Sequence, residues 1–231
     1  MKNIIRLFHI AFAASLLSCY STEVSDSGNI KQSEIHMDYY CEFNAENNVA
    51  DARAIFRFES WKGNTLRLTP PSSITVNNAE MEGEKEWLTG FVYRSRKMKP
   101  TQEFIFHFTD TDNKEYNNKI VVPKIEIKDI PKSIQKSKSL KLYWEGNPLG
   151  KGETIRFHLQ MNDTLQISID NKIKDSKYIE IKPNDLQNMV PGMANIWMER
   201  YVNKSLDEST HIGGNLSGTY CSEKRGIEIT E

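Results

Sequence analysis

Apolar and polar side chains alternate along much of the chain after residue 35. The clearest example lies within residues 50–58, where every second side chain is apolar: Ala50, Ala52, Ala54, Phe56 and Phe58. A repeat of two places these side chains on one face of a strand, whereas a helix would scatter them around its circumference. This segment is therefore predicted to be a strand with one buried face.

Shorter segments of the same kind follow, separated by turns rich in Gly, Pro, Asn and Asp. The predicted strands of the first half are residues 65–68, 74–76, 87–93, 103–108 and 116–122. Those of the second half are residues 139–144, 155–159, 165–169, 178–181, 195–201, 215–221 and 226–229, with one helical turn at 183–188. Short strands with such punctuation are typical of β-sandwiches and barrels, so the predicted fold class is all-β.

A break in the pattern lies between Pro123 and Pro131, after which Leu140, Leu142 and Trp144 again share one face. The roughly 210 residues that follow residue 18 suit either one large domain or two ordinary ones. We therefore predict two consecutive β-sandwich domains, residues 35–123 and residues 124–231.

The N-terminus has the composition of an export signal. Lys2 and Arg6 precede an apolar run over residues 7–17. This run is shorter than the roughly 20 helical residues that cross a hydrocarbon core. Residues 1–18 are therefore predicted to be a signal peptide and not a membrane span.

The segment Leu16-Leu17-Ser18-Cys19 resembles the bacterial lipobox. The resemblance implies that Cys19 becomes the lipidated first residue of the mature protein, held at a membrane by its acyl chains. Tyr20 stands where an aspartate would favour the inner membrane, so the resemblance implies the outer membrane. The alternative is an ordinary secretory signal in which the cysteine is incidental.

The residues that follow the signal are polar, and the mature chain has no basic excess. Residues 19–34 contain almost no large apolar side chains and are predicted to be a flexible tether. Without residues 1–18, 28 Lys and Arg stand against 31 Asp and Glu, a formal net charge of −3. Nothing in this balance favours binding to nucleic acid phosphates, so no nucleic acid partner is predicted.

Two further cysteines, Cys41 and Cys221, are available for a disulfide in an oxidising compartment. The bond would close a loop of about 180 residues, worth roughly 5 kcal/mol in the chain-entropy model. The alternative is two separate buried thiols, one in each predicted domain.

The second half resembles fibronectin type III and immunoglobulin-like domains. Residues 139–144 end in Trp144 and are followed by Asn147-Pro148, which resembles an early strand with a core tryptophan and a proline-bearing turn. The chain as a whole resembles bacterial lipoproteins built of tandem modules of this type. Each half has only one cysteine, so it lacks the cysteine pair of an immunoglobulin domain.

No sequence motif indicates a reaction, a metal or a cofactor. The histidines are isolated, and His107 and His158 are predicted to be surface residues in strands. Residues 109–115 resemble a calcium loop, but Glu115 stands where that loop needs glycine, so a turn made by Asp110 is predicted instead. Nucleophile elbows and glycine-rich phosphate loops are absent.

The four tryptophans fall into two groups. Trp144 and Trp197 occupy predicted core positions, whereas Trp61 and Trp87 stand next to turns, where an exposed ring could contact a ligand.

The sequence therefore favours a membrane-anchored, exported lipoprotein of the bacterial cell envelope that acts as a binding or structural module without catalysis. Its expected partners are the membrane, through the lipid at Cys19, and an envelope protein or glycan. The alternative is a carbohydrate-binding accessory protein or an enzyme whose site forms only in three dimensions.

Overall fold

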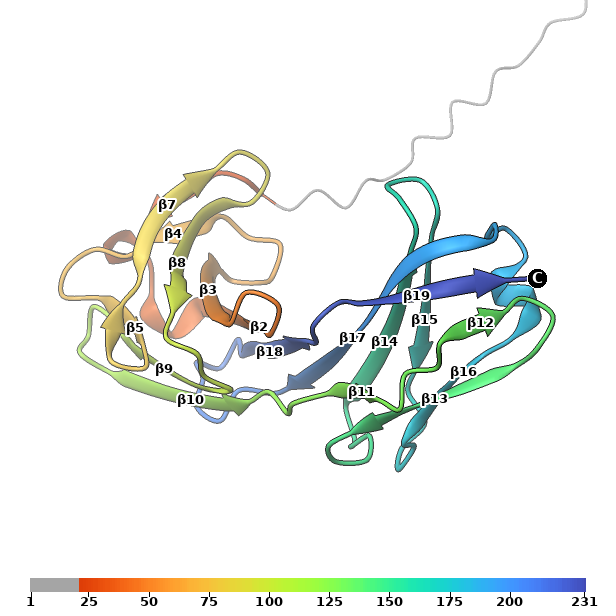
Figure 1. The fold of residues 1–231 in the computed structure, drawn as a ribbon. Coiled ribbons are helices and arrows are strands. Elements are labelled where there is room, and N and C mark those ends of the chain that lie inside the picture. The colour runs from red at the N-terminus through yellow and green to blue at the C-terminus, as the bar shows by residue number, and fades with distance from the viewer. Residues whose placement is uncertain (1–20) are drawn as a thin grey trace, which may run out of the picture.

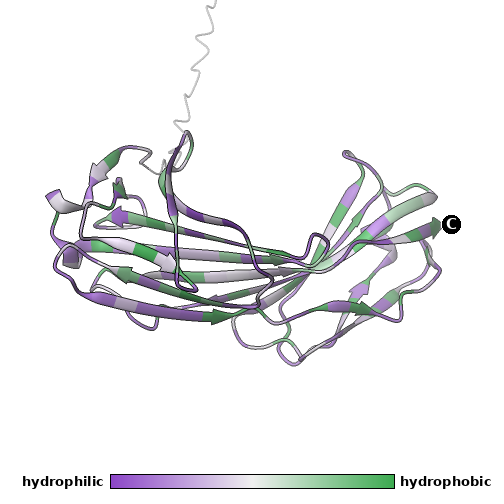
Figure 2. Ribbon diagram, turned by 60° about the vertical axis from the view of Figure 1, so that its left-hand side comes forward, coloured by the Kyte–Doolittle hydropathy of each residue, from purple (hydrophilic) through white to green (hydrophobic). Residues whose placement is uncertain are grey.

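Alternating strands build one sheet that runs the length of the molecule (Figure 1). The computed structural model describes residues 21–231. Strand β2 (Ile35–Asn44) pairs antiparallel with β3 (Val49–Phe58), and every second side chain of β2 is buried. Figure 2 shows the same alternation of hydrophobic and hydrophilic positions along other strands. This period-two pattern is the physical reason for the sandwich, because a sheet with one apolar face is stable only when a second layer covers that face.

The remaining elements are short, and residues 21–231 contain no α-helix. The first half has β1 (Val24–Asp26), β4 (Thr65–Arg67), β5 (Ser73–Val76), β6 (Ala79–Glu80), β7 (Glu82–Glu86), β8 (Gly90–Met98), β9 (Glu103–Thr109) and β10 (Glu115–Val121). The second half has β11 (Glu126–Lys128), β12 (Ser133–Gln135), β13 (Leu140–Glu145), β14 (Glu153–Gln160), β15 (Gln166–Asn171), β16 (Tyr178–Ile181), β17 (Gly192–Lys204), β18 (Gly214–Cys221) and β19 (Arg225–Thr230). Three 3-10 turns are η1 (Ser27–Asn29), η2 (Gln32–Glu34) and η3 (Pro183–Leu186).

The long sheet has twelve strands, and its main path is β1-β4-β3-β2-β18-β17-β14-β15. A four-stranded sheet, β10-β9-β5-β6, covers its apolar face in the first half, and a three-stranded sheet, β11-β13-β16, lies under the second half (Figure 1). Aromatic rings pack between the two sheets of the first half. Tyr39 stacks on Phe106 with ring centroids 4.7 Å apart, and the ring centroids of Phe56 and Phe108 are 4.4 Å apart. The predicted all-β sandwich architecture is confirmed.

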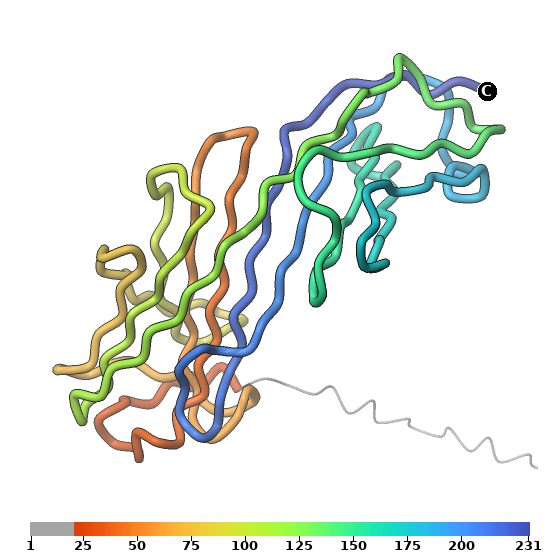
Figure 3. Tube along the Cα trace, turned by 90° about the horizontal axis from the view of Figure 1, so that it is seen from below, coloured from red at the N-terminus to blue at the C-terminus, as the bar shows by residue number. Residues whose placement is uncertain are grey.

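Strands β17 and β18 join the two halves. The first part of β17 pairs with β19, its last part pairs with β18, and β18 pairs in parallel with β2 along its whole length. Figure 3 shows the blue β18 beside the orange β2. Residues 214–221, assigned from the sequence to the second domain, thus share a sheet with the first strands of the other half.

The segment predicted to be a flexible tether is folded from residue 21 onward, so this prediction is wrong for residues 21–34. Strand β1 pairs in parallel with β4. The buried Gln32 side chain donates to the carbonyl oxygens of Ser27 at 2.7 Å and Ile30 at 2.9 Å. Hydrogen bonds from polar side chains thus order a segment that buries little apolar area. Residues 19 and 20, and with them the lipidation prediction at Cys19, lie outside the described residues.

Two further sequence predictions need correction. Residues 87–93 do not form one strand: β7 and β8 are a hairpin, and Trp87 lies at its tip. Trp197 is not a core residue, because it projects from the side of β17 opposite the buried Ile196 and Met198. Trp144 is buried as predicted.

Candidate functional site

The side of the long sheet that faces away from the two smaller sheets carries polar and aromatic side chains. We call this surface the open face. It is defined by alternate residues of five adjacent strands: Arg53, Tyr40, Glu42, Thr219, Cys221, Glu199, Tyr201, Arg156 and His158. Cross-strand pairing brings these residues into rows, since Tyr40 is opposite Arg53 and Tyr201 is opposite Thr219.

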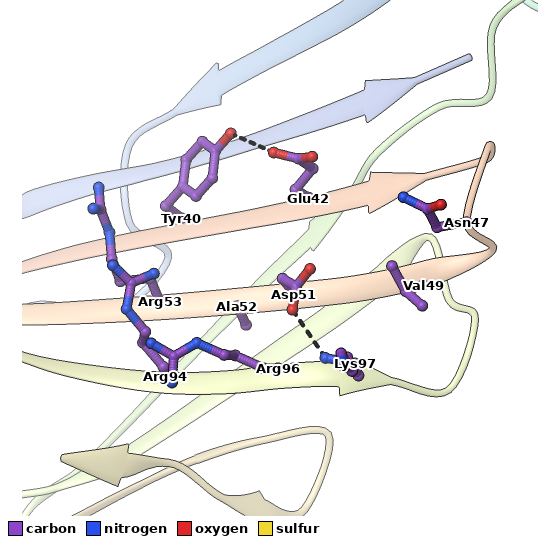
Figure 4. A pocket seen from close by; sticks show the side chains of 10 residues that line it. All are labelled: Tyr40, Glu42, Asn47, Val49, Asp51, Ala52, Arg53, Arg94, Arg96 and Lys97. Carbon is purple, nitrogen blue, oxygen red and sulfur yellow. Dashed lines mark hydrogen bonds between the residues drawn. The ribbon is translucent and has the colours of Figure 1, made fainter. Parts of the chain in front are cut away.

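Two adjoining hollows of about 540 and 410 Å³ lie over the first half of the open face. Both are lined by Tyr40 and Arg53. The larger one is completed by side chains of β2, β3 and β8, among them Glu42, Asp51 and Arg94 (Figure 4). The smaller one extends to the tip of the β7–β8 hairpin at residues 88–89.

Arg53 is a cation that lines both hollows and has no ion-pair partner among the described residues. Its guanidinium lies 5.7 Å from the centroid of the Tyr40 ring, and within residues 21–231 no carboxylate oxygen comes within 4.0 Å of it. Its cross-strand neighbour on β8 is another arginine, Arg94. The carboxylates nearby are already engaged, since Glu84 and Glu86 both pair with Arg94. Arg94 is thus neutralised by two carboxylates, whereas Arg53 makes no ion pair among the described residues, so Arg53 is the cation here that an external anion can reach.

Tyr40 and Glu42 form the polar floor of the larger hollow. The Tyr40 hydroxyl donates to Glu42 Oε2 at 3.2 Å and lies 3.3 Å from Thr219 Oγ1. Burial raises the pKa of Tyr40 to about 12. Burial also raises the pKa of Glu42, and the negative charges of Glu199 and Asp51 add to this, although the hydrogen bond from Tyr40 opposes it.

A second polar cluster surrounds Glu199 on the other half of the open face. His158 Nε2 lies 3.0 Å from Glu199 Oε2, and the Tyr201 hydroxyl donates to the same carboxylate. Burial acts to raise the pKa of Glu199, but the bonds from His158 and Tyr201 outweigh it, so this pKa is below its ordinary value. The carboxylate is therefore held in its charged form by its neighbours.

The aromatic rings of the open face are already covered by charged or aromatic groups. His158 stacks on Trp197 with ring centroids 4.5 Å apart, and Lys224 Nζ lies 4.8 Å from the Trp197 centroid. Arg156 lies 5.3 Å from the Tyr201 centroid. A sugar ring would have to displace these groups in order to stack, so the face offers ion pairs and hydrogen bonds more readily than stacking platforms.

The two remaining cysteines do not form a disulfide in the structure. They lie in adjacent strands, because Cys41 pairs with Gly218 in the β2–β18 register. A side chain added at Gly218 would meet the Cys41 sulfur, so Cys41 and position 218 lie on the same face of the sheet. Cys221 is three residues after Gly218 on β18, and side chains alternate between the faces of a strand, so Cys221 projects from the opposite face. This placement fits the alternative of two separate thiols, and the two thiols lie on adjacent strands of one sheet although the predicted domain boundary separates them.

Neither candidate ligand aromatic lines the two hollows of the open face. Trp61 follows β3 and is 45% exposed, and Trp87 is 88% exposed. Other sequence candidates have local roles: Asp110 Oδ1 accepts from the backbone N–H groups of Asp112 and Lys114, as expected of an Asx turn. Across residues 21–231 no three His, Cys, Asp or Glu side chains converge to hold a metal ion, and no helix has the length and apolar character to cross a membrane.

The sequence carries one local signal for the open face. In residues 50–58 the positions between the buried alanines carry Asp51 and Arg53, so the polar side of this strand was visible. That it meets Tyr40 and Thr219 depends on the β2–β18 pairing, which joins residues about 175 positions apart.

Comparisons with known proteins assign no family. No protein-family model matches the chain. No curated protein sequence matches it either. Among solved structures it is similar to an ICAM-5 D1–D4 ectodomain fragment, with 10% identity and a TM-score of 0.23, over 84% of this chain and 51% of that one. It is also similar to SGBP-B of the Bacteroides ovatus mixed-linkage glucan utilization locus, in complex with a mixed-linkage heptasaccharide, with 7% identity and a TM-score of 0.23, over 85% of this chain and 60% of that one. The chain thus spans between half and two thirds of these structures, and TM-scores this low carry no argument about function.

Proposed function

We propose that the protein is a lipid-anchored binding module of the bacterial cell envelope and that the open face holds its partner. The observation that carries the proposal is Arg53, a cation in a hollow without a carboxylate within 4.0 Å among the described residues and opposite a second arginine. The anchor is the lipid expected at Cys19.

The chemistry of the hollow favours an acidic group on a protein partner. A guanidinium binds a carboxylate through a charge-assisted, two-pronged hydrogen bond, and Arg53 has no such partner among the described residues. The rings of Tyr40 and Trp197 are covered by Arg53, His158 and Lys224, which weighs against a neutral sugar that binds by stacking.

Photo-cross-linking in intact cells tests this function. A photoreactive residue at position 96, which lines the larger hollow and is exposed, should capture one reproducible partner. The same residue at position 105, which is exposed on β9 in the opposite layer, is the control and should not.

A pair of charge variants then separates the hollow from general electrostatics. Arg53→Gln should abolish the capture from position 96. Arg67→Gln, which removes an exposed arginine of β4 that pairs with Asp26 and does not line the hollows, should leave it unchanged. Equal capture from positions 96 and 105, or capture that does not depend on Arg53, contradicts the assignment. A neutral oligosaccharide that binds regardless of Arg53 would favour the carbohydrate-binding alternative.

A further inference from the structure

The fold holds the chain firmly from residue 21 onward. Arg57 Nη1 donates to the carbonyl oxygen of Ser21 at 3.0 Å, and the Ser21 N–H donates to the carbonyl of Lys62 at 3.2 Å. The Ser21 hydroxyl donates to Asn64 Oδ1 at 2.6 Å. Ser21 is therefore docked on the loop that follows β3, and any lipid attached at Cys19 is separated from the folded body by a single residue.

The same arginine joins this loop to the β7–β8 hairpin. Arg57 is 4% exposed and also donates to the carbonyl oxygens of Gly63 at 2.9 Å and Thr89 at 3.3 Å. Arg57 therefore brings three segments together: the start of the described chain, the loop after β3 and the tip of the hairpin. Figures 1 and 2 show the hairpin tip beside the beginning of the coloured ribbon.

Large apolar side chains are exposed at this place. Trp87 and Leu88 at the hairpin tip are 88% and 74% exposed, and Trp61 in the neighbouring loop is 45% exposed. The Lys62 ammonium lies 4.6 Å from the Trp61 ring centroid. Leaving Trp87 and Leu88 in water forgoes the stabilisation that their burial would provide, so such a tip is expected to meet another surface.

We propose that Trp61, Trp87 and Leu88 form a membrane docking surface that inserts into the interface of the bilayer to which the protein is anchored. This proposal rests on the lipid anchor of the proposed function. Two residue steps span at most about 7 Å, so an acylated Cys19 holds Ser21 at the bilayer surface. Because Ser21 is bound to the loop after β3 and, through Arg57, to the hairpin, both are carried to the same depth. Tryptophan suits this position, since its ring is apolar and its N–H remains near water and headgroups.

Quenching by brominated lipid tests the docking. The full acylated chain is reconstituted into vesicles of phosphatidylethanolamine and phosphatidylglycerol with and without bromine on the acyl chains. Part of the tryptophan emission should be quenched, because Trp61 and Trp87 reach the lipid whereas Trp144 is buried in the second half. The variant Trp61→Ser/Trp87→Ser/Leu88→Ser should lose this quenching. Tyr143→Ser, which removes a 49% exposed aromatic on β13, should retain it.

The outcomes separate the docking from the anchor. Mass spectrometry of Cys19 and sedimentation with vesicles report the anchor alone, and an unmodified chain that stays in solution overturns the anchor and with it the docking. An acylated chain that sediments but shows no quenching, or equal quenching in the triple variant, overturns the docking and leaves the anchor intact. Emission of Trp87 that shifts only when envelope proteins are added assigns the surface to a protein partner and also overturns the docking. Urea unfolding of each variant confirms that it is folded.

Discussion

Replacing Arg200 with methionine should destabilise the protein far more than the same replacement of a surface arginine. Arg200 of β17 is 1% exposed, and its guanidinium donates to the carbonyl oxygens of Asn147 at 3.0 Å and Pro148 at 2.9 Å and to the carboxylate of Glu153. Glu153 also accepts from the Gly150 N–H at 2.8 Å. The side chain thus fixes the loop between β13 and β14 on the sheet.

The magnitude follows from what the substitution leaves behind. Arg200→Met fills much of the volume, but it leaves the Glu153 carboxylate, whose side chain is 14% exposed, and two carbonyl oxygens without their donor. Removing one partner of a buried ion pair costs about 3–5 kcal/mol. For a chain of this size, that corresponds to a fall in Tm of about 6–20 °C.

Arg156→Met is the matched control. Arg156 lies on the adjacent strand β14 and bonds Asp170 at 2.6 Å, but the two side chains are 39% and 34% exposed. A surface pair of this kind contributes about 1 kcal/mol or less. Urea unfolding followed by circular dichroism, with equal m-values as a check, gives both free energies of unfolding. In the double variant Arg200→Met/Glu153→Gln part of the loss should be recovered, because no buried charge remains. Equal losses for Arg200→Met and Arg156→Met would refute the argument that burial sets the cost.

Two further predictions concern a strand edge and the thiols. The Lys204 ammonium donates to the Asp207 carboxylate, and the Lys119 N–H on the free edge of β10 donates to Asp207 Oδ2 at 3.2 Å. The bond from Lys204, followed by that from Lys119, holds the pKa of Asp207 below its ordinary 3.8 although partial burial opposes this. Because the folded-state pKa is lowered, the stabilisation is present above the ordinary pKa and is lost as the pH falls through the folded-state pKa. Asp207→Asn should therefore reduce the acid-dependent part of the free energy of unfolding by about 1 kcal/mol or less. Urea unfolding at neutral pH and at about pH 3 measures this difference, and an unchanged pH dependence would contradict it. Burial raises the pKa of Cys221 to about 12 and also raises that of Cys41, so alkylation should be slow in the folded protein and complete for both in urea without reductant. Resistance to alkylation until a reductant is added would show a disulfide and contradict the structure.

The elements that the sequence predicted are those whose signal is local. Strands with one apolar face, such as β9 and β10, follow from alternation because each buried side chain is two residues from the next. The hairpin of β7 and β8 was missed because β7 is Glu82–Glu86, a polar segment whose partner is a neighbouring strand and not the core. Ion pairs such as Arg94 with Glu86 join its two strands, and such pairs leave no periodic pattern in the sequence.

The misplacement of Trp197 has a different cause. Strand β17 buries Arg200 on its core side and carries Trp197 on the open face, so both faces mix apolar and polar residues. Binary patterning fails where a buried charge is satisfied by a distant loop, because the compensating carbonyl groups belong to residues about 50 positions away. The open face itself needs the pairing of β18 with β2, which no local pattern encodes.

The two proposals also constrain each other through the geometry of the hairpin. Leu88 belongs to the membrane docking surface and, with Thr89, also lines the smaller hollow next to Arg53. If the hairpin tip lies in the bilayer interface, a partner whose acidic group reaches Arg53 must approach along the membrane surface. Soluble partners of large size would then be hindered, whereas a short exposed segment of another membrane-associated protein would not. Arg53→Gln should therefore abolish capture of such a partner from position 96 without changing the lipid quenching of the tryptophan emission, because Arg53 belongs to the hollow and not to the membrane docking surface.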